Sequence, residues 1–257
     1  MKLYTKLAAL GAALAMASSY ALADEMIATI ASGSGSTFYA GYAPLTFTVP
    51  STLPSIFPGT IQPVGVNNSN ASTSVYFLDP GTVWAPALTT SFQGVSAQSA
   101  WVSYDKQSGP LGDENGGSKP YDEDGYYFYT TSFNTPGGAM PYSGLLEVAA
   151  DDTVAVYLNG VLLDGEGAIG GDATCSDGIP DCRPGGFETI LIDQSMLNTN
   201  GTGYNQLVFV VEQSGSYDQG LDFSGTVEPT PEPNTLFLLG TGLLGSAGAL
   251  LRKMRTA

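Results

Sequence analysis

The sequence predicts an all-β protein whose folded part is an antiparallel β-sandwich. Gly, Ser, Thr, Asn and Tyr are abundant, and long amphipathic helical periods are absent between the two ends of the chain. Short apolar runs recur between clusters of Gly, Pro and Asp, which is typical of strands joined by turns. Because no crossover helix separates these runs, the pattern favours antiparallel pairing over a parallel α/β sheet.

Residues 1–23 have the features of a secretory signal peptide. Lys2 and Lys6 precede or border an apolar run from Leu7 to Met16, and small residues lead to an expected cleavage site after Ala23. The alternative is an N-terminal membrane anchor, but the apolar run is shorter than the roughly 20 residues of a membrane span.

The mature part, from Asp24 to about Thr230, is strongly acidic. It holds 23 acidic residues and three basic ones, Lys106, Lys119 and Arg183, which gives a net charge near −20. Nucleic acid and anionic membrane surfaces are bound through basic residues, so the charge argues against both as partners. Cations and neutral sugars remain open as ligands, and the acidity also favours simple solubility.

Two regions are expected within the mature part. Residues 24–99 are rich in Gly, Ser, Thr and Pro with short apolar pieces such as Leu45–Val49, and they form either part of the sandwich or a loosely ordered stretch. Residues 100–227 form the sandwich domain. Strands are predicted at Ser74–Leu78, Ala100–Tyr104, Gly125–Phe133, Phe187–Ile192, Gln206–Gln213 and Leu221–Val227.

Two strand predictions are more specific. In Asp151–Leu163 (DDTVAVYLNGVLL) the pair Asn159-Gly160 supplies both positive-φ positions of a type I′ hairpin turn, so a return strand begins at Val161. The run Gln206–Gln213 is apolar on both faces, which predicts a central strand between two layers.

The chain ends, over residues 228–257, in three elements of fixed order. Pro231, Glu232 and Pro233 are followed by an uncharged run from Thr235 to Leu251, and then by the basic residues Arg252, Lys253 and Arg255. As a helix the uncharged run is roughly 25 Å long, just short of the ~30 Å hydrocarbon core of a bilayer. It is predicted to be a short transmembrane helix with its basic end in the cytoplasm. The alternatives are a buried globular helix and a permanent anchor.

These residues resemble the PEP-CTERM sorting signal, in which a Pro-Glu-Pro triplet precedes a short apolar helix and a basic cluster. The resemblance implies recognition by an exosortase, a membrane protease-transpeptidase, after export by the secretion machinery. It also implies transient residence in the inner membrane, processing near Glu232, and a final place at the cell surface or in an extracellular matrix associated with exopolysaccharide and biofilm. The same kind of tail is also known as an ice-binding protein C-terminus.

The order of strands from Ala100 to Val227 resembles the jelly-roll, galactose-binding-like sandwich found in many PEP-CTERM proteins. The pair Asp151-Asp152 matches a position where that pattern usually carries Asp followed by Asp or Asn. Asp side chains at such a place accept backbone N–H groups and shape the turn, so the expected role is structural rather than catalytic.

The residue types present restrict the available chemistry. The chain has no histidine and two cysteines, which excludes a Ser-His-Asp or Cys-His nucleophile and the usual His-containing zinc sites. Cys175 and Cys182 flank a short loop in a secreted chain and are predicted to form a local disulfide. A glycosidase needs only two carboxylates, so this kind of enzyme is not excluded. With 23 acidic residues in the mature part, however, such pairs can arise by chance, and their presence does not indicate an enzyme.

Acidic residues in the loop between the cysteines are candidate calcium ligands. Asp172, Asp177 and Asp181 lie among Gly and Pro, and the stretch from Asp177 to Asp181 (DGIPD) resembles the acidic loop of thrombospondin type 3 calcium repeats. Hard oxygen ligands in a flexible loop suit Ca²⁺, and the alternative is a solvated loop closed by the disulfide. A second acidic stretch, which is more simply a surface loop, comprises Asp113, Glu114, Asp122, Glu123 and Asp124.

Aromatic side chains are the remaining candidates for sugar contacts. The set is Trp84, Trp101, Tyr121, Tyr126, Tyr127 and Tyr129. Because neighbouring residues of a strand point to opposite faces, Tyr127 and Tyr129 share one face and Tyr126 lies on the other. About half of this set is therefore expected in the core, together with both tryptophans.

The sequence thus predicts an exported surface or matrix protein with a non-catalytic β-sandwich. One alternative is a carboxylate-dependent enzyme that degrades polysaccharide. Another, suggested only by the second name of the tail, is an ice-binding adhesin.

Overall fold

The computed structural model describes residues 27–33, 36–53, 73–81, 84–92, 95–110, 122–135, 141–165, 187–199, 203–215 and 218–230, and positions 242, 245 and 252. The chain divides into two units. The larger unit comprises Ile27–Gly138 and Tyr142–Glu228, and the smaller comprises Met1–Met26, Ala139–Pro141 and Pro229–Ala257. The predicted signal peptide and most of the predicted tail helix lie outside the described residues.

The larger unit is all-β, and every strand pair for which a register is resolved is antiparallel. Sheet A has the order β12-β9-β14-β7-β4, with β1 also paired to β14, and sheet B has the order β11-β10-β13-β8-β2-β3. The strands are β1 Ala28–Ala31, β2 Thr37–Pro44, β3 Thr73–Ser74, β4 Tyr76–Phe77, β5 Thr89–Phe92, β6 Val95–Gln98, β7 Val102–Ser103, β8 Gly125–Asn134, β9 Tyr142–Asp151, β10 Thr153–Leu158, β11 Val161–Asp164, β12 Glu188–Asp193, β13 Tyr204–Gln213 and β14 Gly220–Pro229, with a 3-10 turn at Gln194–Met196.

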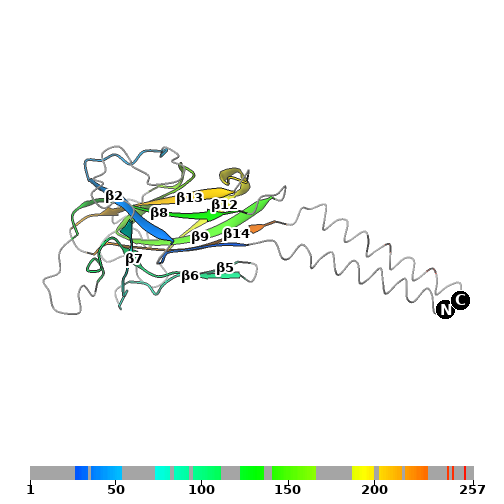
Figure 1. Ribbon diagram of the computed structural model, residues 1–257, viewed down its shortest axis with the longest axis horizontal. Coiled ribbons are helices and arrows are strands. Elements are labelled where there is room, and N and C mark those ends of the chain that lie inside the picture. The colour runs from blue at the N-terminus through cyan, green and yellow to red at the C-terminus, as the bar shows by residue number, and fades with distance from the viewer. Residues whose placement is uncertain are drawn as a thin grey trace. The chain divides into compact units, whose positions relative to one another are not determined.

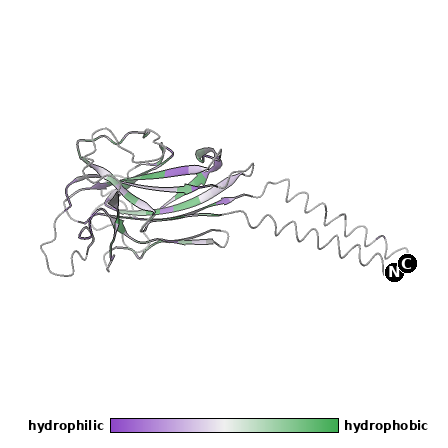
Figure 2. Ribbon diagram, in the orientation of Figure 1, coloured by the Kyte–Doolittle hydropathy of each residue, from purple (hydrophilic) through white to green (hydrophobic). Residues whose placement is uncertain are grey.

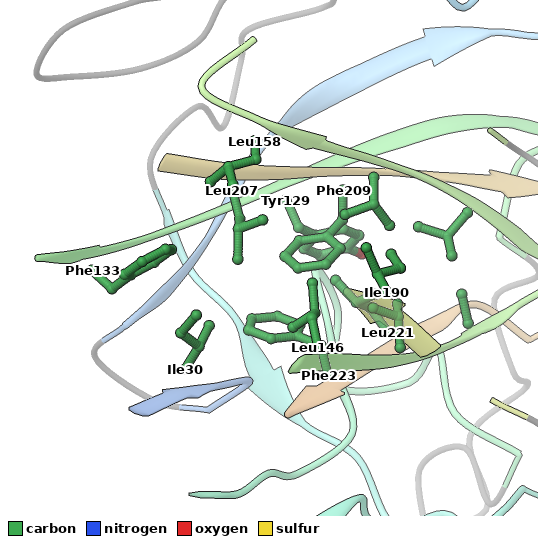
Figure 3. Packing of buried hydrophobic residues seen from close by; sticks show 14 of the residues in the cluster. Ile30, Tyr129, Phe133, Leu146, Leu158, Ile190, Leu207, Phe209, Leu221 and Phe223 are labelled. Carbon is green, nitrogen blue, oxygen red and sulfur yellow. The ribbon is translucent and has the colours of Figure 1, made fainter. Parts of the chain in front are cut away.

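The main core lies between the two sheets, which together form the predicted sandwich. Buried residues of sheet A, including Leu146, Leu221 and Phe223, face buried residues of sheet B, including Tyr129, Leu207 and Phe209 (Figure 3). The Phe209 and Phe223 rings stack across the gap with centroids 4.3 Å apart. Hydrophobic residues are concentrated on the strands of both sheets (Figure 2), and their burial is the principal stabilising contribution to the fold.

The second face of sheet B is also covered. Strand β13 lies between β10 and β8, and its Val208 and Val210 belong to a separate buried cluster on this outer face. The prediction of a central strand covered on both sides is therefore confirmed. Phe47, Val49 and Leu53 pack on that cluster, so Leu45–Val49 is not a strand but a covering segment whose apolar residues close the outer face.

Two of the predicted strand extents are wrong. The run Ser74–Leu78 is interrupted at Val75, because the chain passes there from sheet B (β3) to sheet A (β4) and the Val75 side chain enters the main core. The run Ala100–Tyr104 forms only the two-residue strand β7. By contrast, the Asn159-Gly160 turn joins β10 to β11 with φ angles of 53° and 82°, as a type I′ turn requires.

The hairpin of β5 and β6 forms a third layer that pairs with neither main sheet. Figure 1 shows it beside β9 and β14 of sheet A. Strands β1 to β4, from the Gly/Ser/Thr/Pro-rich region, occupy places in both main sheets. Across the described residues, no helix has the length and apolar character needed to cross a membrane.

The stacked pair between the sheets gives a stability prediction. Replacing Phe223, which is fully buried, by Ala should lower the free energy of unfolding by about 3–5 kcal/mol, because it removes apolar burial and leaves a cavity. Urea unfolding measures the change. The matched control is Leu191→Ala, at a side chain that is 73% exposed, which should change stability by no more than about 0.5 kcal/mol. Equal losses for the two variants would contradict this account of the core.

Candidate functional site

Strand β14 carries a row of polar side chains on the outer face of sheet A. Its inner residues Leu221, Phe223 and Val227 belong to the main core. The alternating residues, called here the polar row, are Asp222, Ser224, Thr226 and Glu228. Such alternation usually marks a solvent-exposed face, but all four are buried. A buried polar face requires partners, because unpaired polar groups away from water cost free energy.

The first member of the row, Asp222, connects three segments of the chain. Its Oδ1 accepts a hydrogen bond from Ser32 Oγ at 2.8 Å, and its Oδ2 accepts one from the Leu88 backbone N–H at 2.9 Å. Burial raises the pKa of Asp222, and the hydrogen bonds that the carboxylate accepts oppose this rise. The side chain thereby joins β14 to the end of β1 and to the segment that leads into the β5–β6 hairpin.

The second member, Ser224, holds the hairpin itself. Its Oγ donates to the Ala97 carbonyl at 2.6 Å and accepts from the Thr90 N–H at 3.1 Å. The Thr90 hydroxyl lies 2.8 Å from both the Ser224 carbonyl oxygen and a carboxylate oxygen of Glu147. These hydrogen bonds attach both strands of the hairpin to sheet A.

The last two members of the row differ from the first two. Thr226 Oγ1 and Glu228 Oε1 are buried and have no hydrogen-bond partner. Burial also raises the pKa of Glu228, because the charged carboxylate is partly removed from water. The satisfied part of the row thus lies under the hairpin, and the unsatisfied part lies at the C-terminal end of β14.

The chain leaves the sandwich at this end of β14. In the smaller unit, the N–H and the hydroxyl of Thr230 both donate to the carbonyl oxygen of Pro141, at 2.7 and 3.0 Å. Among the predicted sorting residues, Arg252 is helical and exposed. Pro231, Glu232, Pro233, Lys253 and Arg255 lie outside the described residues.

The Asp151-Asp152 pair has internal partners. Asp151 Oδ2 accepts from the Trp84 indole Nε1 at 2.6 Å, and Asp152 Oδ2 accepts from the Ser214 N–H at 2.7 Å. Both carboxylates are buried at the turn between β9 and β10. The donor to Asp152 is a backbone N–H, but it lies 62 positions away in sequence, and the donor to Asp151 lies 67 positions away. These two bonds therefore join distant segments of the chain, which the local sequence pattern does not predict.

The acidic candidates for metal binding do not form a cluster of ligands within the described part of the chain. Asp122 is buried, and its carboxylate accepts hydrogen bonds from Tyr104 OH at 2.6 Å and Ser108 Oγ at 3.1 Å. At Glu123 and Asp124 the backbone carbonyl oxygens accept hydrogen bonds from the hydroxyls of Tyr127 and Tyr42, respectively. Within the described ranges, no group of three or more potential metal ligands occurs. The calcium candidates Asp172, Asp177 and Asp181, the cysteines Cys175 and Cys182, and the acidic residues Asp113 and Glu114 lie outside those ranges.

The aromatic residues proposed from sequence as a sugar platform are in the core where they are described. Trp84, Trp101, Tyr126, Tyr127 and Tyr129 are all buried, and Tyr121 lies outside the described residues. Tyr127 and Tyr129 share the inner face of sheet B and Tyr126 the outer face, as predicted. Both faces are covered, however, so more of the set is buried than the sequence predicts.

The exposed aromatic side chains lie elsewhere. Among the described side chains they are Phe38 on β2 and the neighbours Tyr76 and Phe77 on β4, which are 52% and 56% exposed. The exposure of this pair cannot be read from the sequence, because the two residues lie in an apolar run of the kind that fills a core. Strand β4 is the last strand in the order of sheet A, which leaves both side chains accessible.

Removing the Asp222 carboxylate should weaken the attachment of the hairpin. In Asp222→Ala the Leu88 N–H and the Ser32 hydroxyl lose an acceptor, so the free energy of unfolding should fall by roughly 2 kcal/mol, and the amides of Thr90 and Ser99 should exchange faster with deuterium. Asp222→Asn retains an acceptor and is the matched control, with a smaller loss expected. Unchanged exchange at both amides in Asp222→Ala would contradict the role of Asp222.

Neutralising Glu228 should change how stability depends on pH. The pKa of Glu228 is raised in the folded state, so protonation of Glu228 stabilises the fold. This stability is fully present below the unfolded-state pKa of about 4.3, and it is lost as pH rises through the folded-state pKa. Glu228→Gln should therefore melt at a higher temperature than the wild type at pH 7, and this difference should shrink toward pH 4. A difference in melting temperature between the variant and the wild type that stays constant from pH 4 to pH 7 would contradict a raised pKa of Glu228 in the folded state.

Two comparisons with known proteins bear on this end of the molecule. No curated protein sequence is similar enough to the chain to count as a relative. Residues 229–253 match the PEP-CTERM protein-sorting motif, which begins on the last residue of β14. The chain is therefore an exported protein that carries a PEP-CTERM signal for exosortase-dependent sorting to the cell surface.

Proposed function

We propose that this protein is a non-catalytic component of an extracellular matrix, which its β-sandwich joins by binding exopolysaccharide. The observation that carries the proposal is the sorting motif at residues 229–253, directly after the last strand of the sandwich. Exosortase-sorted proteins are associated with exopolysaccharide and biofilm, as the resemblance of the tail implies. The sandwich is then the part delivered outside the cell.

The hydrogen bonds of the buried acids support a non-catalytic role. Asp151, Asp152 and Asp222 each accept a hydrogen bond from a segment distant in sequence, and each holds two parts of the sandwich together. A glycosidase needs two carboxylates on either side of an accessible substrate bond. These three side chains are at most 4% exposed and serve the fold instead.

The exposed pair on β4 supports a sugar contact. An aromatic ring offers apolar area to the C–H face of a sugar, and the Tyr76 hydroxyl adds a polar rim. Adjacent residues of a strand point to opposite faces, so Tyr76 and Phe77 provide two separate contacts rather than one platform. The strongly acidic mature chain favours a neutral polysaccharide over an anionic one.

The sorting part of the proposal is tested in the native host. With an epitope inserted in the sandwich, the wild-type protein should lose a C-terminal fragment near Glu232 and reach the cell surface. A strain without the exosortase should retain the full-length chain, and so should a variant with Pro231, Glu232 and Pro233 replaced by Ala. Normal processing in the strain without exosortase would refute this part.

The polysaccharide part is tested by co-sedimentation with exopolysaccharide from the same host. The double variant Tyr76→Ala with Phe77→Ala should be retained at least about fivefold less than the wild type, since a lost aromatic contact is worth about 1 kcal/mol or more. Leu191→Ala, an exposed aliphatic control, should bind as the wild type does. Equal retention of the two variants would refute the aromatic contact, and release of new reducing ends by the wild type would favour a polysaccharide-degrading enzyme.

A further inference from the structure

The sorting motif and the sandwich share a boundary with no spacer. Strand β14 ends at Pro229, where the motif begins, and the Pro-Glu-Pro triplet starts two residues later. An enzyme that acts on a peptide commonly holds it extended and hydrogen-bonds its main chain. Residues paired within a sheet have already used those main-chain groups. The residues before the triplet are therefore inaccessible to an enzyme while β14 stays paired.

The end of β14 is tightly packed on both sides. On one side, Thr226 and Val227 pair with Thr29 and Ala28 of β1. On the other side lies Gly144 of β9, where an added Cβ would be 2.6 Å from the Thr226 carbonyl oxygen and 2.8 Å from Val227 Cγ2. No larger residue fits at position 144 without moving the end of β14 away from β9.

The same end of the strand has the least favourable polar interactions of the polar row. Thr226 Oγ1 and Glu228 Oε1 are buried without a partner, whereas Asp222 and Ser224 are hydrogen-bonded. Opening the strand from Thr226 onward would expose both atoms to water and remove this cost. Local opening is cheapest where the folded state gains least, so β14 should open first beside the motif.

We propose that the exosortase binds a segment longer than the Pro-Glu-Pro triplet, one that includes Thr226–Glu228, and that this end of β14 unpairs to enter the enzyme. The inference rests on the sorting part of the proposed function. It makes local opening of the sandwich a step in processing, so the packing around Thr226 sets the rate at which the tail is removed.

Two substitutions shift this opening in opposite directions. Thr226→Val keeps the shape of the side chain and removes the unpaired hydroxyl, so it should stabilise the strand end and slow processing at least threefold. Gly144→Ala pushes the strand end from β9 and should speed processing at least threefold. The matched control is Gly125→Ala on β8 of sheet B, where the added Cβ would lie 2.6 Å from the Ala43 carbonyl oxygen. It should lower the melting temperature as Gly144→Ala does, but leave the processing rate within twofold of wild type.

The experiment is a pulse-chase of the full-length chain in the native host, with melting temperatures and amide exchange at Val227 measured on the purified proteins. A second set of variants carries six Gly/Ser residues between Thr230 and Pro231, which gives the enzyme extended chain without opening β14. With this insertion the wild type, Thr226→Val and Gly144→Ala should be processed at the same rate.

Three results would overturn the inference. The first is an unchanged processing rate in Thr226→Val although exchange at Val227 slows, and the second is equal acceleration by Gly144→Ala and Gly125→Ala, which would indicate a global effect. The third is a difference among variants that persists after the insertion. Absence of exosortase-dependent processing in the wild type would refute the sorting itself, so the two failures are distinguishable.

Discussion

The carboxylate of Asp222 is the interaction on which the layering of this sandwich depends. It lies in the middle of sheet A with no exposed surface, and its two oxygens accept from Ser32 and Leu88. An isolated buried charge is costly, and hydrogen bonds from both directions offset part of its desolvation. Because these donors belong to the end of β1 and the approach to the hairpin, one side chain determines how three segments meet.

Much of the fold can be predicted from local pattern. The apolar run in β13 and the Asn159-Gly160 turn are correctly predicted because each depends on residues that are close in sequence. The burial of the outer face of β14 cannot be predicted in this way, because that face is covered by a hairpin more than a hundred residues away in sequence. The hydrogen bond between Thr90 and Ser224, for example, spans 134 positions. Alternation in β14 identifies two faces correctly but cannot say what covers the polar one.

The candidate site shows the same division. The sorting motif, matched at residues 229–253, is predictable from sequence because its parts are contiguous and need no fold to be recognised. The unpartnered atoms of Thr226 and Glu228 are not predictable, since burial and missing donors are properties of the assembled sheets. Conversely, the aromatic residues chosen from sequence fill the core, and the exposed pair Tyr76 and Phe77 lies in a run that looks like core.

The pairing of β1 with β14 also has a consequence for the order of events during export. Ala28 and Val227 are partners in sheet A although they lie near opposite ends of the folded part. A chain that crosses a membrane from its N-terminus delivers β1 first and β14 last, so sheet A cannot close until nearly the whole chain has emerged. Such long-range contacts are associated with slow folding. Completion of the sandwich and arrival of the sorting tail therefore fall at the same late moment of translocation.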